Sequence, residues 1–218
     1  MENFVELSRL YREVGGVPGP EGWSVEARDA VRGRLDEILA VWLDEPLSSA
    51  GFRRSSDKWV LGKDAVRPIV DVQRKKTFKF EGVVEFTINW GVWVEPFARQ
   101  IGRAKRPAPM TSTAPFAARI GDLLPAKEDV WWAVLSNGFI RTSPTPRLEG
   151  EPTPDDDVPR ILRNRLIPML QPIDTVSAAI AAIESWVALG LTPSTIHIAV
   201  DPLVTLRRFV EGTEAKQG

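Results

Sequence analysis

The chain has 218 residues, of which 43% are hydrophobic and 26% charged, and its 28 Lys and Arg residues nearly balance its 29 Asp and Glu residues, for a formal net charge of -1. This length and composition are typical of a globular chain that can bury a core without metals or disulfides. The lack of Cys excludes disulfides, thiolate metal sites and cysteine nucleophiles, and the single His excludes metal motifs that need two histidines.

The sequence favours a cytoplasmic protein. Residues 1–14 mix charged residues among the apolar ones and lack the apolar core of a signal peptide. The most apolar stretches, 83–94 and 176–191, contain charged residues and are too short to cross a membrane. We therefore expect no contact with a membrane.

A long amphipathic helix is predicted to start at Ser24. Its apolar residues recur at three- and four-residue spacing: Val31, Leu35, Ile38, Leu39, Trp42 and Leu47. Pro46 is expected to bend or end this helix, and Gly51 to turn the chain into the next element.

The period then changes to two, which predicts three antiparallel strands between residues 52 and 94. The connections at 62–64 and 76–82 suit hairpins and are too short for crossover helices. On the third strand the even-numbered residues from 84 to 94 are mostly apolar and form one face. Glu85, Thr87, Asn89 and Trp93 form the other, which we expect to be partly open.

Two further strands are predicted at 116–123 and 130–135, and a short one at 195–200. Helices are predicted at 160–170, from Asp174 to Gly190 and from Asp201 onward. The expected fold class is therefore α+β, an antiparallel sheet of about five strands packed against N-terminal and C-terminal helices.

Three stretches rich in Pro and Gly punctuate the chain, at 15–22, 103–113 and 142–159. The third also carries five acidic residues and is expected to be an extended loop. We therefore divide the chain into an N-terminal segment at 1–24, a core of helix and sheet at 25–141, an acidic Pro-rich loop at 142–159 and a C-terminal helical part of the same domain at 160–218.

One predicted sheet surface carries the strongest candidate for chemistry. Asp71, Gln73 and Lys75 alternate along the second strand and share a face, where Glu85 and Asn89 of the next strand can join them. One hypothesis is a divalent-metal nuclease or phosphodiesterase, because Gln73-Arg74-Lys75 resembles the Gln-x-Lys motif of restriction-endonuclease-type enzymes. Carboxylates of Asp71 and Glu85 would then hold Mg²⁺. The alternation equally suits a solvated polar face joined by cross-strand pairs, and we favour that interpretation.

Positive charge is concentrated in two stretches. Residues 51–80 hold nine basic and three acidic residues, and no acidic residue lies between 98 and 119. An acidic partner surface would suit these stretches, and nucleic acid is a second alternative that the near-neutral total charge disfavours. The candidate binding residues in them are Arg53, Arg54, Arg99, Arg103, Lys105 and Arg106.

The remaining signals are isolated. Trp93 could offer a binding platform, although an indole more often covers a core. His197 has no second His to form a relay. No dinucleotide or phosphate-binding Gly motif and no nucleophile elbow occurs, so no cofactor is expected.

Several short motifs in register carry a family resemblance. They are Pro46-Leu47, Gly51-Phe52-Arg53-Arg54, Val72-Gln73-Arg74-Lys75, the run from Phe86 to Val92, the run from Arg119 to Leu123, and Trp131-Trp132. From about residue 25 to about residue 135 the chain resembles a bacterial domain of unknown function, family forty-three zero four in the catalogue of uncharacterised domains. The resemblance implies an α+β domain whose sheet opens with the Gly-Phe-Arg-Arg strand, and it implies no known activity.

Together these observations favour a noncatalytic protein-binding or accessory module, and a toxin-neutralising role fits that description. The partner is expected to contact the polar sheet face and the basic stretches. The support is a foldable scaffold with a charged surface and no complete catalytic set.

Overall fold

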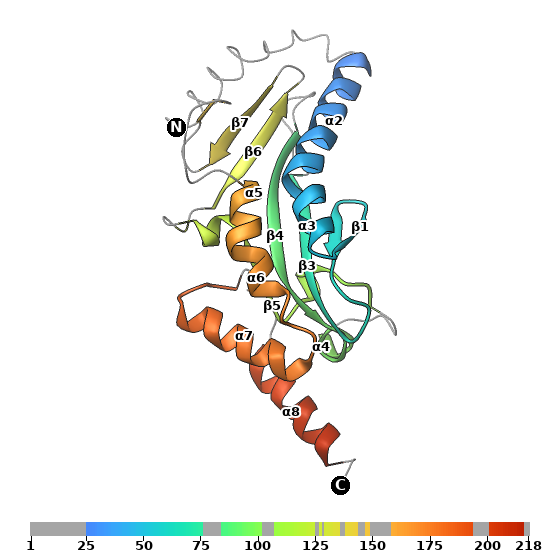
Figure 1. The fold of residues 1–218 in the computed structure, drawn as a ribbon, viewed down its shortest axis with the longest axis vertical. Coiled ribbons are helices and arrows are strands. Elements are labelled where there is room, and N and C mark those ends of the chain that lie inside the picture. Colours follow the sequence, from blue (N-terminus) through green and yellow to red (C-terminus); the bar gives the residue numbers. More distant parts are fainter. Residues whose placement is uncertain are drawn as a thin grey trace.

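An antiparallel sheet with helices packed on one face forms the body of the protein (Figure 1). The structure is a computed structural model that describes residues 25–75, 84–101, 107–124, 127, 129–135, 138–143, 147–148, 158–193 and 201–215. The helices on the sheet come from both the N-terminal and the C-terminal part of the chain, so the predicted α+β class is confirmed. Within the described ranges, no helix has the length and apolar character that a membrane span requires.

The sheet has eight strands, more than the predicted number of about five, and short strands lie at both of its edges. Their order is β1-β2-β3-β4-β6-β7-β8, and β5 also pairs with β4, next to β6. The strands are β1 (Arg53–Ser55), β2 (Lys58–Val60), β3 (Val66–Arg74), β4 (Val84–Val94), β5 (Phe116–Arg119), β6 (Trp131–Leu135), β7 (Gly138–Ser143) and β8 (Arg147–Leu148). Strand β8 lies inside the stretch that was expected to be an acidic loop.

The helical elements follow the predicted pattern with shifted ends. They are α2 (Val25–Leu39), the π-helical turn η1 (Ala40–Asp44), α3 (Glu45–Ser49), α4 (Glu95–Ile101), the 3₁₀ turns η2 (Thr111–Thr113) and η3 (Ile120–Leu123), α5 (Val158–Ile161), the π-helical turn η4 (Leu162–Leu166), α6 (Ile167–Leu170), α7 (Val176–Ala188) and α8 (Pro202–Glu214). Helix α7 is capped by Thr175, whose hydroxyl accepts a hydrogen bond from the Ala178 amide at 3.1 Å, and not by Asp174. Ser24, His197 and the predicted strand at 195–200 lie outside the described residues.

Pro46, which was expected to bend or end the first helix, does not end it. Proline lacks the amide hydrogen that an α-helix needs at this position. The helix widens before it into η1, where the Glu45 amide bonds to the Ala40 carbonyl, five residues back. The same device precedes Pro168, where the Ile167 amide bonds to the Leu162 carbonyl. Each helix therefore runs on past its proline and keeps its apolar face on the sheet.

The main core lies between these helices and the even-numbered face of β4, as the alternation predicts. Phe86, Ile88, Trp90, Val92 and Val94 are all fully buried there. Aromatic rings from distant parts of the chain meet over this face: Trp42 of η1 contacts Phe86 and Trp132, and Trp186 of α7 contacts Trp90 and Phe116. We call this side of the sheet the helix face.

The opposite side of the sheet, the second face, is covered at one end. Trp93 is only 1% exposed and packs with Ile69, Ala98, Ala114 and Ala117 in a small second core. Helix α4 and the chain after Met110 supply this cover, so the face that was expected to be partly open is closed at this end. Farther along the face, Gln73 and Lys75 are exposed.

Strand β5 is shorter than predicted and ends at Arg119. The Asp122 carboxylate accepts a hydrogen bond from the Arg119 amide at 2.9 Å, which starts the 3₁₀ turn η3 where the strand was expected to continue.

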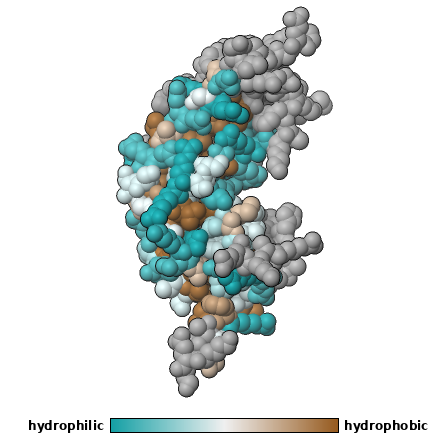
Figure 2. All heavy atoms as spheres, turned by 90° about the vertical axis from the view of Figure 1, so that its right-hand side faces the viewer, coloured by the Kyte–Doolittle hydropathy of each residue, from teal (hydrophilic) through white to brown (hydrophobic). Residues whose placement is uncertain are grey.

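The side of the molecule that carries α2 and the β1 edge is largely hydrophilic, with hydrophobic residues only in small areas (Figure 2).

Candidate functional site

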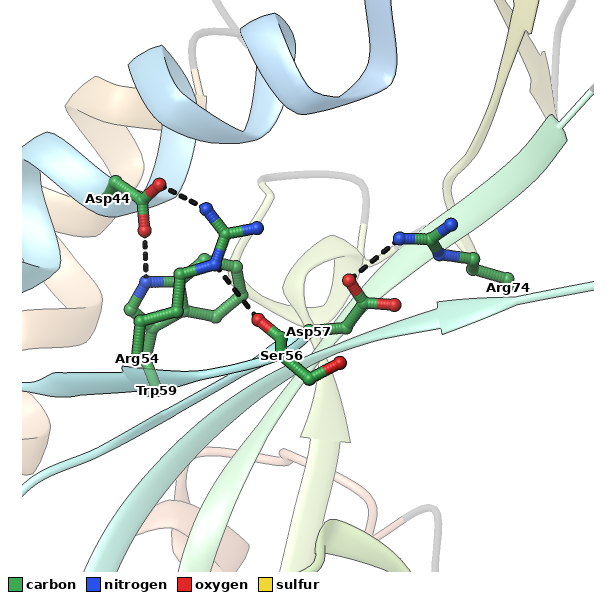
Figure 3. Close-up of polar contacts among 6 residues, drawn as sticks. All are labelled: Asp44, Arg54, Ser56, Asp57, Trp59 and Arg74. Carbon is green, nitrogen blue, oxygen red and sulfur yellow. Dashed lines mark hydrogen bonds and ion pairs between the residues drawn. The ribbon is translucent and has the colours of Figure 1, made fainter. Parts of the chain in front are cut away.

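The hairpin of β1 and β2 is joined to the helices by polar contacts at Asp44 (Figure 3). Asp44, at the end of η1, accepts hydrogen bonds from the Trp59 indole at 2.7 Å and from the Arg54 guanidinium. The Arg54 guanidinium also lies over the Trp59 ring, 5.1 Å from its centre. Arg54 is therefore tied to the helix side of the hairpin and is not offered to a partner on the second face.

The turn of this hairpin is held by its own side chains (Figure 3). Ser56 has a φ of 57°, in the left-handed region, and its carbonyl accepts a hydrogen bond from Arg54 Nε at 2.9 Å. Asp57 accepts from Arg74 of β3 at 2.7 Å. These contacts fix the orientation of β1, the outermost strand at this edge of the sheet.

Strand register gathers basic side chains on the second face at this edge. Arg53 stands opposite Val60, and Val60 stands opposite Ile69, so all three side chains share the second face. Lys58 lies two residues from Val60 along β2, and Arg67 lies two residues from Ile69 along β3. Arg67 is therefore a diagonal neighbour of Val60, and Lys58 is a diagonal neighbour of Arg53, about 7–8 Å away by backbone. With Lys63 of the β2–β3 connection, we call Arg53, Lys58, Lys63 and Arg67 the basic cluster.

Two cations of the basic cluster, Lys58 and Arg67, donate to carbonyl groups and not to carboxylates. Lys58 donates to the Pro109 carbonyl at 2.7 Å, and Arg67 donates to the carbonyls of Asp64 at 2.7 Å and Lys63 at 2.6 Å. Among the described residues, no carboxylate forms an ion pair with any of the four. Carbonyl dipoles orient a cation without neutralising it, so the cluster keeps its positive charge.

The two basic stretches of the sequence meet at this place. The Lys58 hydrogen bond joins β2 to Pro109, which is 51 residues further along the chain. Arg99 lies in α4 and pairs with Glu95 one helical turn earlier. Arg103, Lys105 and Arg106, the other predicted binding residues of the second stretch, lie outside the described residues, between α4 and Pro107.

Next to the basic cluster runs a row of linked polar groups. Asp71 stands opposite Asn89, and Gln73 stands opposite Thr87, which confirms that these side chains share one face. The Asn89 amide donates to Asp71 at 3.0 Å and to Gln73 at 3.2 Å, and the Thr111 hydroxyl donates to the other oxygen of Asp71 at 2.6 Å. Both Asp71 oxygens are therefore engaged.

Lys75 and Glu85 form a separate group beyond this row. Their charged groups are 2.7 Å apart, with the Lys75 side chain 48% exposed and that of Glu85 13% exposed. The Lys75 ammonium lies 5.7 Å from the centre of the Trp131 ring, and the Arg119 guanidinium lies 5.1 Å from it. Arg119 also pairs with Asp129. Two cations, Lys75 and Arg119, therefore lie against the half-buried Trp131 ring, and each is paired with a carboxylate.

The metal-dependent nuclease hypothesis needs Asp71 and Glu85 close enough to share one cation, and they are too far apart. Asp71 is level with Asn89, whereas Glu85 lies four residues farther along β4, a distance of about 13 Å along the strand. Two carboxylates that far apart cannot ligate one cation at 2–2.6 Å. Within the described parts of the chain, no group of three or more His, Asp or Glu residues is placed to hold a metal ion.

Trp93 lies in the interior of the second face, and the half-buried Asp122 lies in the turn η3 that follows β5. Trp93 is buried, so it offers no platform to a partner, and its indole nitrogen has no hydrogen-bond partner among the described residues. Burial raises the pKa of the Asp122 carboxyl above its ordinary value, and the nearby Asp129 charge adds to the rise. The hydrogen bond from Arg119 and the charges of Arg119 and Lys127 oppose it.

Sequence reasoning missed four residues of this surface. Lys58, Lys63 and Arg67 entered only as part of a charge count, because the register that places Lys58 and Arg67 beside Val60 is a property of pairing between strands. Thr111 lies in a Pro-rich stretch where no periodic pattern marks it. A residue-by-residue alternation could have placed Lys58 with Val60 on one face, had β1 and β2 been predicted as separate short strands.

One family comparison bears on the chain. Residues 43–142 match the family described as a domain of unknown function (DUF4304). This matched region runs from η1 to β7 and includes the basic cluster, the polar row and the covering segment after α4. No curated protein and no solved structure matches the chain.

Proposed function

We propose that the protein is a noncatalytic binding module that recognises a protein partner with the basic-cluster edge of its second face. The observation that carries this proposal is the charge state of the face. Arg53, Lys58 and Arg67 lie around the half-buried Val60, with Lys63 in the adjoining connection, and Lys58 and Arg67 donate to carbonyl groups, while the nearby carboxylates Asp71 and Glu95 are engaged within the protein. A surface of this kind can attract a partner that carries negative charge.

The internal pairing of the acidic groups supports a binding role over catalysis. Asp71 accepts from an amide and a hydroxyl, and Glu85 pairs with Lys75. A general base needs a free lone pair directed at a substrate proton. Here the carboxylates hold neighbouring side chains in place, which suits a preorganised surface.

An accessory role, such as neutralising another protein, follows from this proposal. We also propose a cytoplasmic location, which the cysteine-free sequence favours. The fold presents the surface on a sheet that is rigidly backed by the main core. A rigid platform lowers the entropy lost on binding.

Affinity capture with charge-reversed variants tests the proposal. The tagged protein is expressed in its own cells as the native chain, as the double variant Arg53→Glu, Lys63→Glu, and as the control double variant Arg32→Glu, Arg208→Glu. All four positions are exposed, and both variants change the net charge equally. We expect a partner that the native chain and the control retain and that the cluster variant loses. Equal retention by both double variants would refute the role of this surface.

A further inference from the structure

We infer that the partner contributes an acidic, extended peptide segment that lies across the basic cluster. This inference rests on the proposed function and names the chemistry of the partner at the same surface. It depends on three features of the described residues: the spacing of the cations, the absence of carboxylate partners for them, and the acidic groups that border the cluster.

The spacing of the cations matches an extended chain. Arg53 and Lys58 are diagonal neighbours, about 7–8 Å apart by backbone, and Arg67 lies two strands and two residues from Arg53, about 12 Å away. In an extended peptide, residues two apart project from the same side at about 6.6 Å. Two carboxylates two residues apart can therefore meet Arg53 and Lys58, and a carboxylate four residues from one of them, about 13 Å away, can reach Arg67.

Each cation can accept a carboxylate without breaking an existing ion pair. Lys58 and Arg67 donate to backbone carbonyls, and a Lys or Arg head has further N–H donors to give. Arg53 and Lys63 are exposed. By contrast, Arg54, Arg74 and Arg99 nearby are already paired with Asp44, Asp57 and Glu95.

The border of the cluster favours a peptide over nucleic acid. Asp64, Asp71 and Glu95 flank the cations at the turn, along the row and at the start of α4. A continuous phosphate backbone would pass these carboxylates and be repelled, whereas a peptide can place neutral residues opposite them. The total charge of -1 also gives little long-range attraction for a polyanion.

Fluorescence anisotropy with defined probes tests this inference. The probes are a labelled peptide of alternating Glu and Thr, its counterpart of alternating Gln and Thr, and a labelled oligothymidylate, each titrated with the full chain at low and at physiological ionic strength. We expect the Glu–Thr peptide to bind about tenfold more tightly than the Gln–Thr peptide at low ionic strength, and more weakly as salt rises. Equal affinities for the two peptides, or tighter binding of the oligothymidylate, would overturn the inference.

Variants locate the binding and separate it from the proposed function. Arg53→Glu and, independently, Lys63→Glu should each weaken Glu–Thr binding about three- to tenfold, and the control Arg32→Glu by less than about twofold. Circular dichroism confirms that each variant is folded. If Arg32→Glu weakened binding of the Glu–Thr peptide as much as Arg53→Glu or Lys63→Glu does, the assignment of the binding site to the basic cluster would be contradicted. If the capture experiment yields a partner that depends on the cluster while the Glu–Thr peptide fails to bind, the acidic chemistry is refuted and the proposed function stands.

Discussion

Replacing Asp44 should loosen the edge hairpin that presents the basic cluster. In Asp44→Ala the buried Trp59 indole loses its acceptor, and an orphaned buried donor costs about 1–3 kcal/mol. The ion pair with Arg54 is about one-third exposed on both sides and adds at most about 1 kcal/mol. The free energy of unfolding should therefore fall by about 1–4 kcal/mol, which at this chain length lowers Tm by about 2–16 °C.

Urea unfolding of two further variants separates the two contributions. Asp44→Asn keeps an oxygen acceptor for the indole and removes only the charge, so its loss should stay below about 1 kcal/mol. In a Trp59→Phe background there is no indole donor to orphan, and Asp44→Ala should then cost only the ion-pair contribution. Equal losses for Asp44→Ala and Asp44→Asn, or a loss that Trp59→Phe leaves unchanged, would refute this account of the hairpin.

Three further predictions concern the sheet and its two faces. Trp93→Phe removes a buried donor that has no partner in the described structure, so it should change the free energy of unfolding by less than about 1 kcal/mol in a urea titration. Trp90→Phe loses a 3.0 Å hydrogen bond to a β5 carbonyl and should cost more in the same assay. Gly91→Ala places a Cβ 2.3 Å from a β5 carbonyl oxygen and should destabilise by about 1–3 kcal/mol or more, while Gly33→Ala, in open space on α2, should stabilise by up to about 1 kcal/mol in the same assay. The raised pKa of Asp122 means that the folded state binds the carboxyl proton more tightly than the unfolded state does, so ionisation of Asp122 lowers the free energy of unfolding as the pH rises from the unfolded pKa of 3.8 through the folded pKa. Asp122→Asn should therefore become more stable relative to the native chain over this pH range. Below pH 3.8 the variant should lose this advantage. An Asp122→Asn difference that does not vary with pH would contradict the last prediction.

The regular parts of the fold follow from periodicity. The amphipathic helix and the alternation of β4 predicted the main core, because both arise from burial of one face. The continuation of the helix through Pro46 could not be read from the sequence, since it depends on a π-helical turn that tertiary packing of Leu43 and Leu47 maintains. Local rules describe what a proline prevents and not how a widened turn accommodates it.

The candidate surface was only partly predictable for a related reason. Alternation placed Asp71, Gln73 and Lys75 on one face, and strand pairing confirmed Asn89 as their neighbour. The cover over Trp93 comes from a Pro-rich stretch with no periodic signal, so the sequence could not show which end of that face was closed. The contact between Lys58 and Pro109 likewise joins two segments that are distant in sequence and share no local pattern.

Site-specific photocrosslinking tests the central claim most directly. A photoreactive residue is placed at Ser55, which is exposed on the second face beside Lys58, or at Ser177, which is exposed on α7. The account predicts a crosslinked partner from position 55 that is lost in the Arg53→Glu, Lys63→Glu background, and none from position 177. A partner captured equally from both positions, or from position 177 alone, would contradict it.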